Sequence, residues 1–343
     1  MGFRAGRAQM DALFNAWQAE GFTVVAPKLF AGTGRFSETD IVRYDAVTSI
    51  DEVVFDRRAD YSFKEALTPI RQTLFYFAGE STTEAESPRA GGAVIFLRNC
   101  DRCALEALDD MYLRNGEEDF YYQRLREHCR FVVMGCSHSF EDCFCVSMGT
   151  NVAPDYDMAI DPAGDDFLLD VKNPGWQGIL AGIGAPEQPV TPQTVSDNAV
   201  QVALPEAIPD RAALCASEIW QEYDERCIAC GRCTLVCPSC TCFTMQDLFY
   251  DDAGKIGERR RVQASCMIDG YTDVAGGGSY RQKNSARMRF KALHKVYDHR
   301  ARFGRNMCVG CGRCTAICPE YIDFAAILNK VDGEVRRQEG GRA

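Results

Sequence analysis

The chain has 343 residues, of which 46% are hydrophobic and 25% are charged, and its formal net charge is -11. This length is enough for two domains with real cores, and the composition excludes disordered and collagen-like chains. Eighteen cysteines in a chain of this size do not resemble the disulfide framework of a small secreted domain. We therefore expect reduced thiols that are available to metals.

The N-terminal segment MGFRAGRAQMDALFNAW has no apolar stretch after its charged residues, and no run of about 18 apolar residues occurs in the sequence. These features predict a cytoplasmic protein with no membrane contact.

The first 184 residues are expected to form an α/β domain. Apolar residues at positions 10, 13, 14 and 17 have helical spacing, and the strand TVVAPK follows. We expect a helix through SFKEAL and PIRQTLFYF. From residue 93, the apolar strands AVIFLR and RFVVMG alternate with helices in CALEALDDMYLRNG and FYYQRLREH. This alternation predicts a parallel βαβ arrangement, so that the two strands are neighbours.

Residues 185–210 contain five prolines among polar residues and are expected to form a linker or an extended wrap. Residues 211–335 are expected to form a second, mainly helical domain, with helices around ALCASEIWQEY and SARMRFKALHKVYDHRARF. Residues 336–343 are expected to be a flexible tail. The fold class predicted for the whole chain is therefore α+β.

Two cysteine runs, CIACGRCTLVCP and CVGCGRCTAICP, each have the spacing C-x2-C-x2-C-x3-C-P of a ferredoxin-type [4Fe-4S] cluster. In two-cluster ferredoxins the fourth cysteine of each run binds the cluster of the other run. The expected ligands are Cys227, Cys230, Cys233 and Cys318 for the first cluster, and Cys308, Cys311, Cys314 and Cys237 for the second. Zinc is the alternative metal, but structural zinc sites use two separated cysteine pairs, whereas here three close thiols are followed by a fourth.

About 70 residues, from Pro238 to Met307, separate the two runs, and this insert has a helical pattern. Compact two-cluster ferredoxins have no such insert. The second domain resembles the α-helical ferredoxins found in iron-sulfur subunits of respiratory oxidoreductases.

A third [4Fe-4S] site is expected from Cys100, Cys136, Cys143 and Cys145. Cys100 and Cys136 lie just past the two apolar strands, and ligands gather at the carboxyl ends of parallel strands. Cys103 could replace one of these thiols, and His138 offers a nitrogen. The alternative is that these cysteines are ordinary buried apolar residues.

The remaining cysteines have no ligand spacing that we recognise. Cys129 and Cys215 are expected to pack in the core. Cys240, Cys242 and Cys266 could shield a cluster, form a buried thiol group or act as further ligands, and we favour packing.

Nine Lys or Arg and one Asp occur between Arg281 and Arg305. They could form a solvated helix face, a docking surface for an acidic partner, or a positive field near a cluster. Nucleic-acid binding is not expected, because the chain is acidic overall and no aromatic platform accompanies these residues.

No dinucleotide fingerprint, phosphate-binding loop or catalytic Ser/His/Asp or Cys/His pattern occurs in the sequence. We therefore expect no catalytic residues and no flavin or sirohaem in this chain. Such a protein would carry single electrons between partners.

The segments GRFSETDIVRY, PIRQTLFYF, NCDRCAL, DDMYLRNG, CFCVSMGTN and ERRRVQASCM, together with the two runs, resemble the A subunit of anaerobic sulfite reductase. This resemblance extends from about residue 10 to residue 335. The elements CFC and CVGCGRC are more distantly similar to the beta subunit of cytosolic sulfhydrogenases.

The closer resemblance implies a cytoplasmic complex in which a flavin subunit takes hydride from NADH and a sirohaem subunit reduces sulfite to sulfide. This chain would be the non-catalytic electron-relay subunit between them. The family pattern has cysteine at the positions of Cys100, Cys136, Cys143 and Cys145, and is more variable at Cys103. The alternative is the same relay in a sulfhydrogenase-like complex, with polysulfide or a hydrogenase as the acceptor.

Overall fold

The computed structural model describes residues 1–34, 38–87, 89 and 91–340. Its helices and sheets confirm the α+β class. Three residues of the GRFSETDIVRY segment, 35–37, lie outside the described residues.

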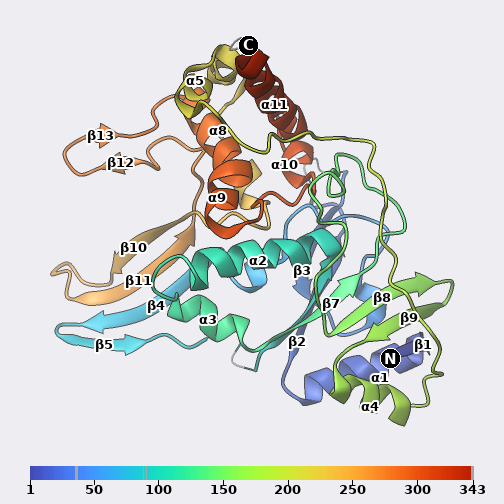
Figure 1. Ribbon diagram of the computed structural model, residues 1–343. Helices are drawn as coiled ribbons and strands as arrows, with labels where there is room; N and C mark the ends of the chain where they lie inside the picture. The colour runs from blue at the N-terminus through green and yellow to red at the C-terminus, as the bar shows by residue number, and fades with distance from the viewer. Residues whose placement is uncertain (35–37, 88, 90, 341–343) are drawn as a thin grey trace.

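A seven-stranded mixed sheet forms the core of the N-terminal half (Figure 1). Its strands, in spatial order, are β1 (Gly2–Gly6), β9 (Asp166–Val171), β8 (Met158–Ala163), β7 (Cys129–Met134), β6 (Ala93–Arg98), β2 (Thr23–Phe30) and β3 (Ile41–Ala46). The strands β2, β6, β7 and β8 run parallel to one another, as the apolar pattern of AVIFLR and RFVVMG predicts. The prediction that β6 and β7 are neighbours is confirmed.

Helices cover both faces of this sheet. Alternate residues of β6 point to opposite faces, with Phe96 in one core and Leu97 in the other. The first core is completed by α1 (Arg7–Ala19) and α4 (Pro174–Gly182), and the second by α2 (Asn99–Leu113) and α3 (Phe120–Arg126). The helix predicted from positions 10, 13, 14 and 17 is α1, and those four residues are its buried ones.

A second sheet joins segments that are far apart in sequence. Its strands are β10 (Phe243–Phe249), β11 (Ile256–Gln263), β4 (Arg71–Ala78) and β5 (Ser81–Glu84), all antiparallel. The prediction of a helix through SFKEAL and PIRQTLFYF is therefore wrong. The segment PIRQTLFYF contains β4, and SFKEAL contains only the 3-10 turn η2 (Phe63–Ala66). Aromatic and β-branched residues favour the strand once β11 supplies a partner.

The C-terminal half is a helical layer that lies above the large sheet in the view of Figure 1. Its helices are α5 (Arg211–Ala216), α6 (Glu222–Arg226), α7 (Arg232–Leu235), α8 (Asn284–Leu293), α9 (His299–Phe303), α10 (Arg313–Ala316) and α11 (Phe324–Gly340), with a π-helical turn, η4 (His294–Asp298), between α8 and α9. They pack around a third core that contains Trp220, Leu293 and Phe324.

The insert between the cysteine runs is helical only in its second half. The part before α8 forms β10, β11 and a small hairpin of β12 (Asp273–Val274) and β13 (Gly278–Ser279). Residues 185–210 follow an extended path with no named helix or strand. The expected flexible tail is wrong for residues 336–340, because α11 continues to Gly340, and residues 341–343 lie outside the described chain. Within the described residues, no helix is long and apolar enough to cross a membrane.

Candidate functional site

The first cavity of interest, here called site A, is lined by the three leading thiols of the first run and by the last thiol of the second run: Cys227, Cys230, Cys233 and Cys318. Cys318 follows α10, which brings it back to the first run although it is distant in sequence. Of the 18 cysteines, all of which lie in the described residues, Cys230 is the one that is exposed. Site A therefore opens to the surface at that thiol.

The second cavity, site B, is lined by Cys308, Cys311, Cys314 and Cys237. Each fourth cysteine thus lies with the leading three of the other run. Cys233 and Cys314 line both cavities, so sites A and B share a wall.

Two lysines of the basic segment lie at these cavities. Lys291 and Lys295 are only 4% and 3% exposed, and both line site B. The Lys295 ammonium donates to Cys237 Sγ at 3.2 Å and to Ser239 Oγ at 3.1 Å. The solvated-face interpretation is therefore wrong for these two residues, which place positive charge beside the thiols.

The charges at site B fit an anionic metal cluster. Burial raises the pKa of the Cys308 thiol to about 12. Although burial alone would lower the pKa of Lys291, the neighbouring Cys233 and Cys314 thiolates raise it. In the described part of the chain, neither lysine forms an ion pair with a carboxylate. Metal binding deprotonates such thiols, and an anionic cluster would provide the missing counter-charge.

The thiols surround cavities, and they are not arranged around the position of a single metal ion. Among the described residues, no group of three or more His, Cys, Asp or Glu side chains is arranged to hold a single metal ion. In sites A and B the donor set is four thiols around a hollow, as a [4Fe-4S] cluster requires.

The third expected set also lies together. Cys100, Cys136, Cys143 and Cys145 line one cavity, site C, together with His138, Arg58, Arg98, Arg313 and Asn198. Cys100 lies in the first turn of α2, just after β6, and Cys136 follows β7. Burial raises the pKa of Cys145 to about 12.

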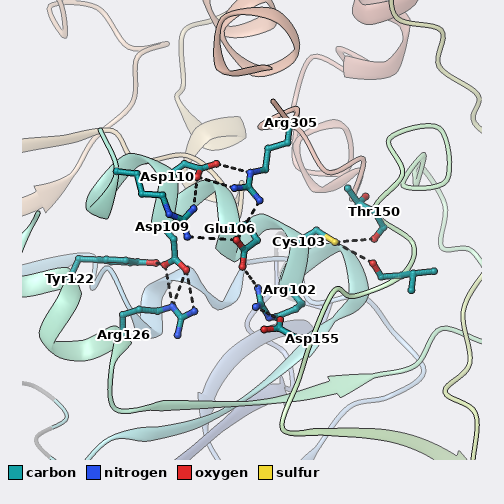
Figure 2. A network of polar contacts seen from close by, with 12 residues as sticks. Arg102, Cys103, Glu106, Asp109, Asp110, Tyr122, Arg126, Thr150, Asp155 and Arg305 are labelled. Carbon is teal, nitrogen blue, oxygen red and sulfur yellow. Dashed lines mark hydrogen bonds and ion pairs between the residues drawn. The ribbon is translucent and has the colours of Figure 1, made fainter. Parts of the chain in front are cut away.

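Cys103 does not line site C. It lies one turn further along α2, where its thiol contacts the carbonyl oxygens of Thr150 and Val152 at 3.8 and 3.5 Å (Figure 2). His138 is the nitrogen donor that the structure places at this cavity.

Sites B and C are joined by direct contacts between their loops. The Phe144 amide donates to Gly310 O at 2.8 Å, and Arg58 Nη1 donates to Cys311 O at 2.7 Å while lying 3.5 Å from Cys143 Sγ. Gly310 has a φ of 65°, and a Cβ there would lie 2.6 Å from the Phe144 carbonyl. Glycine is needed at this position because the two loops approach so closely.

A second set of contacts ties α2 to the segment before the second run (Figure 2). Asp110, on α2, accepts from Arg305 Nη2 at 3.1 Å, and Glu106 is 3.4 Å from Arg305 Nη1. The helix that carries Cys100 therefore also holds the chain that leads into Cys308.

Several residues around site C had no recognisable signal in the sequence. Asn198, from the extended wrap, accepts from the Val146 amide at 2.8 Å, and Gln193 O accepts from the Cys136 amide at 3.1 Å. The segment predicted as a linker or wrap therefore covers site C. Arg58 and Arg98 come from irregular or strand positions whose neighbours in space could not be deduced.

The cysteines expected to pack behave differently from one another. Cys129 is buried at the start of β7 and its thiol donates to Leu125 O at 3.1 Å. Cys215 is partly buried in α5 and packs against the third core. Cys240, Cys242 and Cys266, in contrast, line one further cavity of about 190 Å³.

Comparison with known proteins agrees with this arrangement. Residues 226–322 match the family of 4Fe-4S dicluster domains, a range that contains both cysteine runs. The chain is 30% identical over 312 residues to the sulfhydrogenase 2 subunit beta of Pyrococcus furiosus, and the alignment covers 84% of this chain and 88% of that protein.

Proposed function

This chain belongs to the family of sulfhydrogenase beta subunits, and we propose on that premise that it is the electron-relay subunit of a sulfhydrogenase-like complex. The terminal acceptor would be a hydrogenase partner or polysulfide. As a family member with a dicluster domain, the chain is an iron-sulfur subunit of an oxidoreductase.

The observation that supports this proposal best is that three thiol-lined cavities adjoin one another in a row. Site A shares Cys233 and Cys314 with site B, and site B touches site C through the contacts of Phe144 and Arg58. We propose the cluster ligands to be those named for sites A and B, with a third cluster held by the four thiols of site C. When bound, [4Fe-4S] clusters accept and release single electrons.

The protein would contribute position and charge. Buried lysines favour the more negative state of a neighbouring cluster, and the arginines Arg58 and Arg98 would do the same at site C. The apolar walls, which include Phe144 and Phe324 at site B, exclude water.

We further propose that residues 211–335 form the two-cluster domain and residues 1–184 the domain of the third cluster, in a cytoplasmic complex. Strand β11, which pairs with β4 on one side and with β10 on the other, would hold the two domains in fixed register.

Site A is the proposed place where a partner subunit docks and exchanges electrons with this chain. Cys230 is exposed there, and Ile228, which lines the same cavity, is 58% exposed. Tyr321, close to Cys318 in sequence, is 83% exposed. A small apolar surface beside a cluster is suited to a transient redox contact.

A second candidate is the electron-relay subunit of an NADH-dependent anaerobic sulfite reductase, between a flavin subunit and a sirohaem subunit. It is favoured by the likeness of segments outside the cysteine runs, including NCDRCAL and ERRRVQASCM.

Purification of the chain with its native partners tests the two candidates. Nickel without sirohaem absorption in the purified complex supports the sulfhydrogenase-like assignment. Sirohaem absorption together with sulfite-dependent oxidation of NADH overturns it and supports the second candidate. A chain that is isolated with neither iron nor acid-labile sulfide after anaerobic purification contradicts both.

A further inference from the structure

Three thiols outside sites A, B and C line the cavity of about 190 Å³ noted above. Cys240 and Cys242 follow the first run, and Cys266 follows β11. His294, the first residue of the π-helical turn η4, lines the same cavity. Three separate segments of the chain thus bring three sulfurs and one imidazole to a single hollow.

Polar contacts hold the segments that carry these thiols. The Tyr271 hydroxyl donates to the carbonyl oxygen of Phe243, the residue after Cys242, at 3.4 Å. Ser265, beside Cys266, shares a hydrogen bond of 2.5 Å with the buried Thr234 of α7. Lys64 Nζ donates to Cys240 O at 3.2 Å. These contacts hold the backbone at Cys240 and the residues next to Cys242 and Cys266, so the three thiol-bearing segments are fixed around the cavity.

The charge of the cavity suits an anionic occupant. Its lining includes the cations Arg281, Lys291 and Lys295, and no carboxylate is among the lining residues that the structure describes. Lys291 and Lys295 are almost fully buried, so their charges are costly unless anions lie beside them.

His294 places an imidazole at the wall of this cavity. Its ring stacks on Phe290 with centroids 5.3 Å apart and an interplanar angle of 7°. The π-helical turn that presents it is an uncommon geometry, which is frequent at functional sites.

We propose that this cavity, here called site D, binds an additional iron-sulfur cluster with Cys240, Cys242 and Cys266 as thiolate ligands and His294 as the nitrogen ligand. A single ion is not favoured, because the described side chains form no group suited to one. A cluster of iron and sulfide is larger, and with three thiolates it supplies the negative charge that the cations require.

Site D lies beside the other sites. Lys291 lines sites A, B and D, and Lys295 lines sites B and D. The proposed function uses none of the four ligands of site D, so the two proposals stand or fall separately.

Cys242→Ser and Cys266→Ser test the assignment, with Cys215→Ser as the matched control. After anaerobic purification, each of the two variants should contain about two to four fewer irons per chain than the wild type, as for a [2Fe-2S] or [4Fe-4S] centre, with an equal loss of acid-labile sulfide. The control should keep the wild-type content. The EPR signals that depend on Cys230 and Cys308 should persist in both variants, which would show that sites A and B are intact.

If the serine variants fail to fold, His294→Cys provides a second test of the proposed ligands. Because histidine in place of cysteine raises the potential of an iron-sulfur centre, this variant should keep its iron and lower the midpoint potential of one signal. Unchanged iron in both serine variants overturns the proposal, as does a Cys242–Cys266 disulfide found by mass spectrometry in the anaerobic protein. Neither result affects the signals of sites A and B.

Discussion

Arg313 and Asp101 form a bidentate ion pair in the interior of the protein, with Nη1–Oδ1 and Nη2–Oδ2 distances of 2.5 and 2.8 Å. Their side chains are 1% and 0% exposed. Asp101 follows Cys100 at the start of α2, and Arg313 precedes Cys314 at the start of α10. The pair therefore connects the helix of site C to the second cysteine run.

Asp101→Asn should destabilise the fold by about 3–5 kcal/mol, because it leaves the buried Arg313 charge without its partner. Urea unfolding followed by circular dichroism under anaerobic conditions measures the change. Asp166→Asn is the control, since Asp166 pairs with Arg4 at the surface and its loss should cost less than about 1 kcal/mol. Equal destabilisation by both substitutions would contradict the structural role of the pair.

Lys295→Met should lower the reduction potential of the site B cluster. The Lys295 ammonium lies 3.2 Å from Cys237 Sγ and favours the more negative, reduced state. The expected shift is on the order of 60 mV, which corresponds to ~1.4 kcal/mol for one electron. EPR-monitored redox titration measures it. The control Lys330→Met removes a charge that is 42% exposed and should leave the potential unchanged. An unaltered potential in Lys295→Met would count against the proposed ligand Cys237.

The sequence predicted the parts of the site that depend on local patterns. The spacing of the two runs identified eight thiols, and the apolar strands β6 and β7 placed Cys100 and Cys136 together because parallel neighbours end at one edge. It could not predict that PIRQTLFYF forms β4, because the partner strand β11 lies far away in sequence.

A positive field near a cluster was one interpretation of the basic segment, but the sequence did not show which of its residues are buried. Lys291 and Lys295 are four residues apart, a spacing that is typical of an exposed helix face. Only the packing of α8 and η4 against the cysteine runs shows that they point inward. A buried thiol group of Cys240, Cys242 and Cys266 was one alternative from the sequence, and their common cavity depends on where β11 ends.

Cys100→Ser should remove about four irons per chain, since a cubane holds four and Cys100 lines site C. Cys103→Ser should retain them, because its thiol contacts backbone carbonyls of residues 150 and 152 and lies outside that cavity. Iron and acid-labile sulfide analysis distinguishes the two variants. Full iron content in Cys100→Ser would show that site C holds no cluster.

Ile228→Asp should slow electron exchange with the partner at site A without changing the iron content. Ile228 is 58% exposed and lines the cavity that opens at Cys230. A loss of about 1.4 kcal/mol in docking would reduce the rate roughly tenfold at subsaturating partner concentration. Stopped-flow reduction of the chain by the partner measures the rate. Ile256→Asp, on β11, is the control because Ile256 is 49% exposed and lies away from the cysteine runs. A rate that falls equally in both variants would locate the contact elsewhere.

The exchange of fourth ligands between the two runs is the most direct test of the paired arrangement. EPR of the anaerobically reduced chain should show that Cys318→Ser alters the same signal as Cys227→Ser, since both thiols line site A. The signal that Cys308→Ser alters should change in Cys237→Ser and persist in Cys318→Ser, because Cys237 and Cys308 line site B. If Cys318→Ser instead alters only the signal that depends on Cys308, each run holds its own cluster and the arrangement of sites A and B described above is wrong.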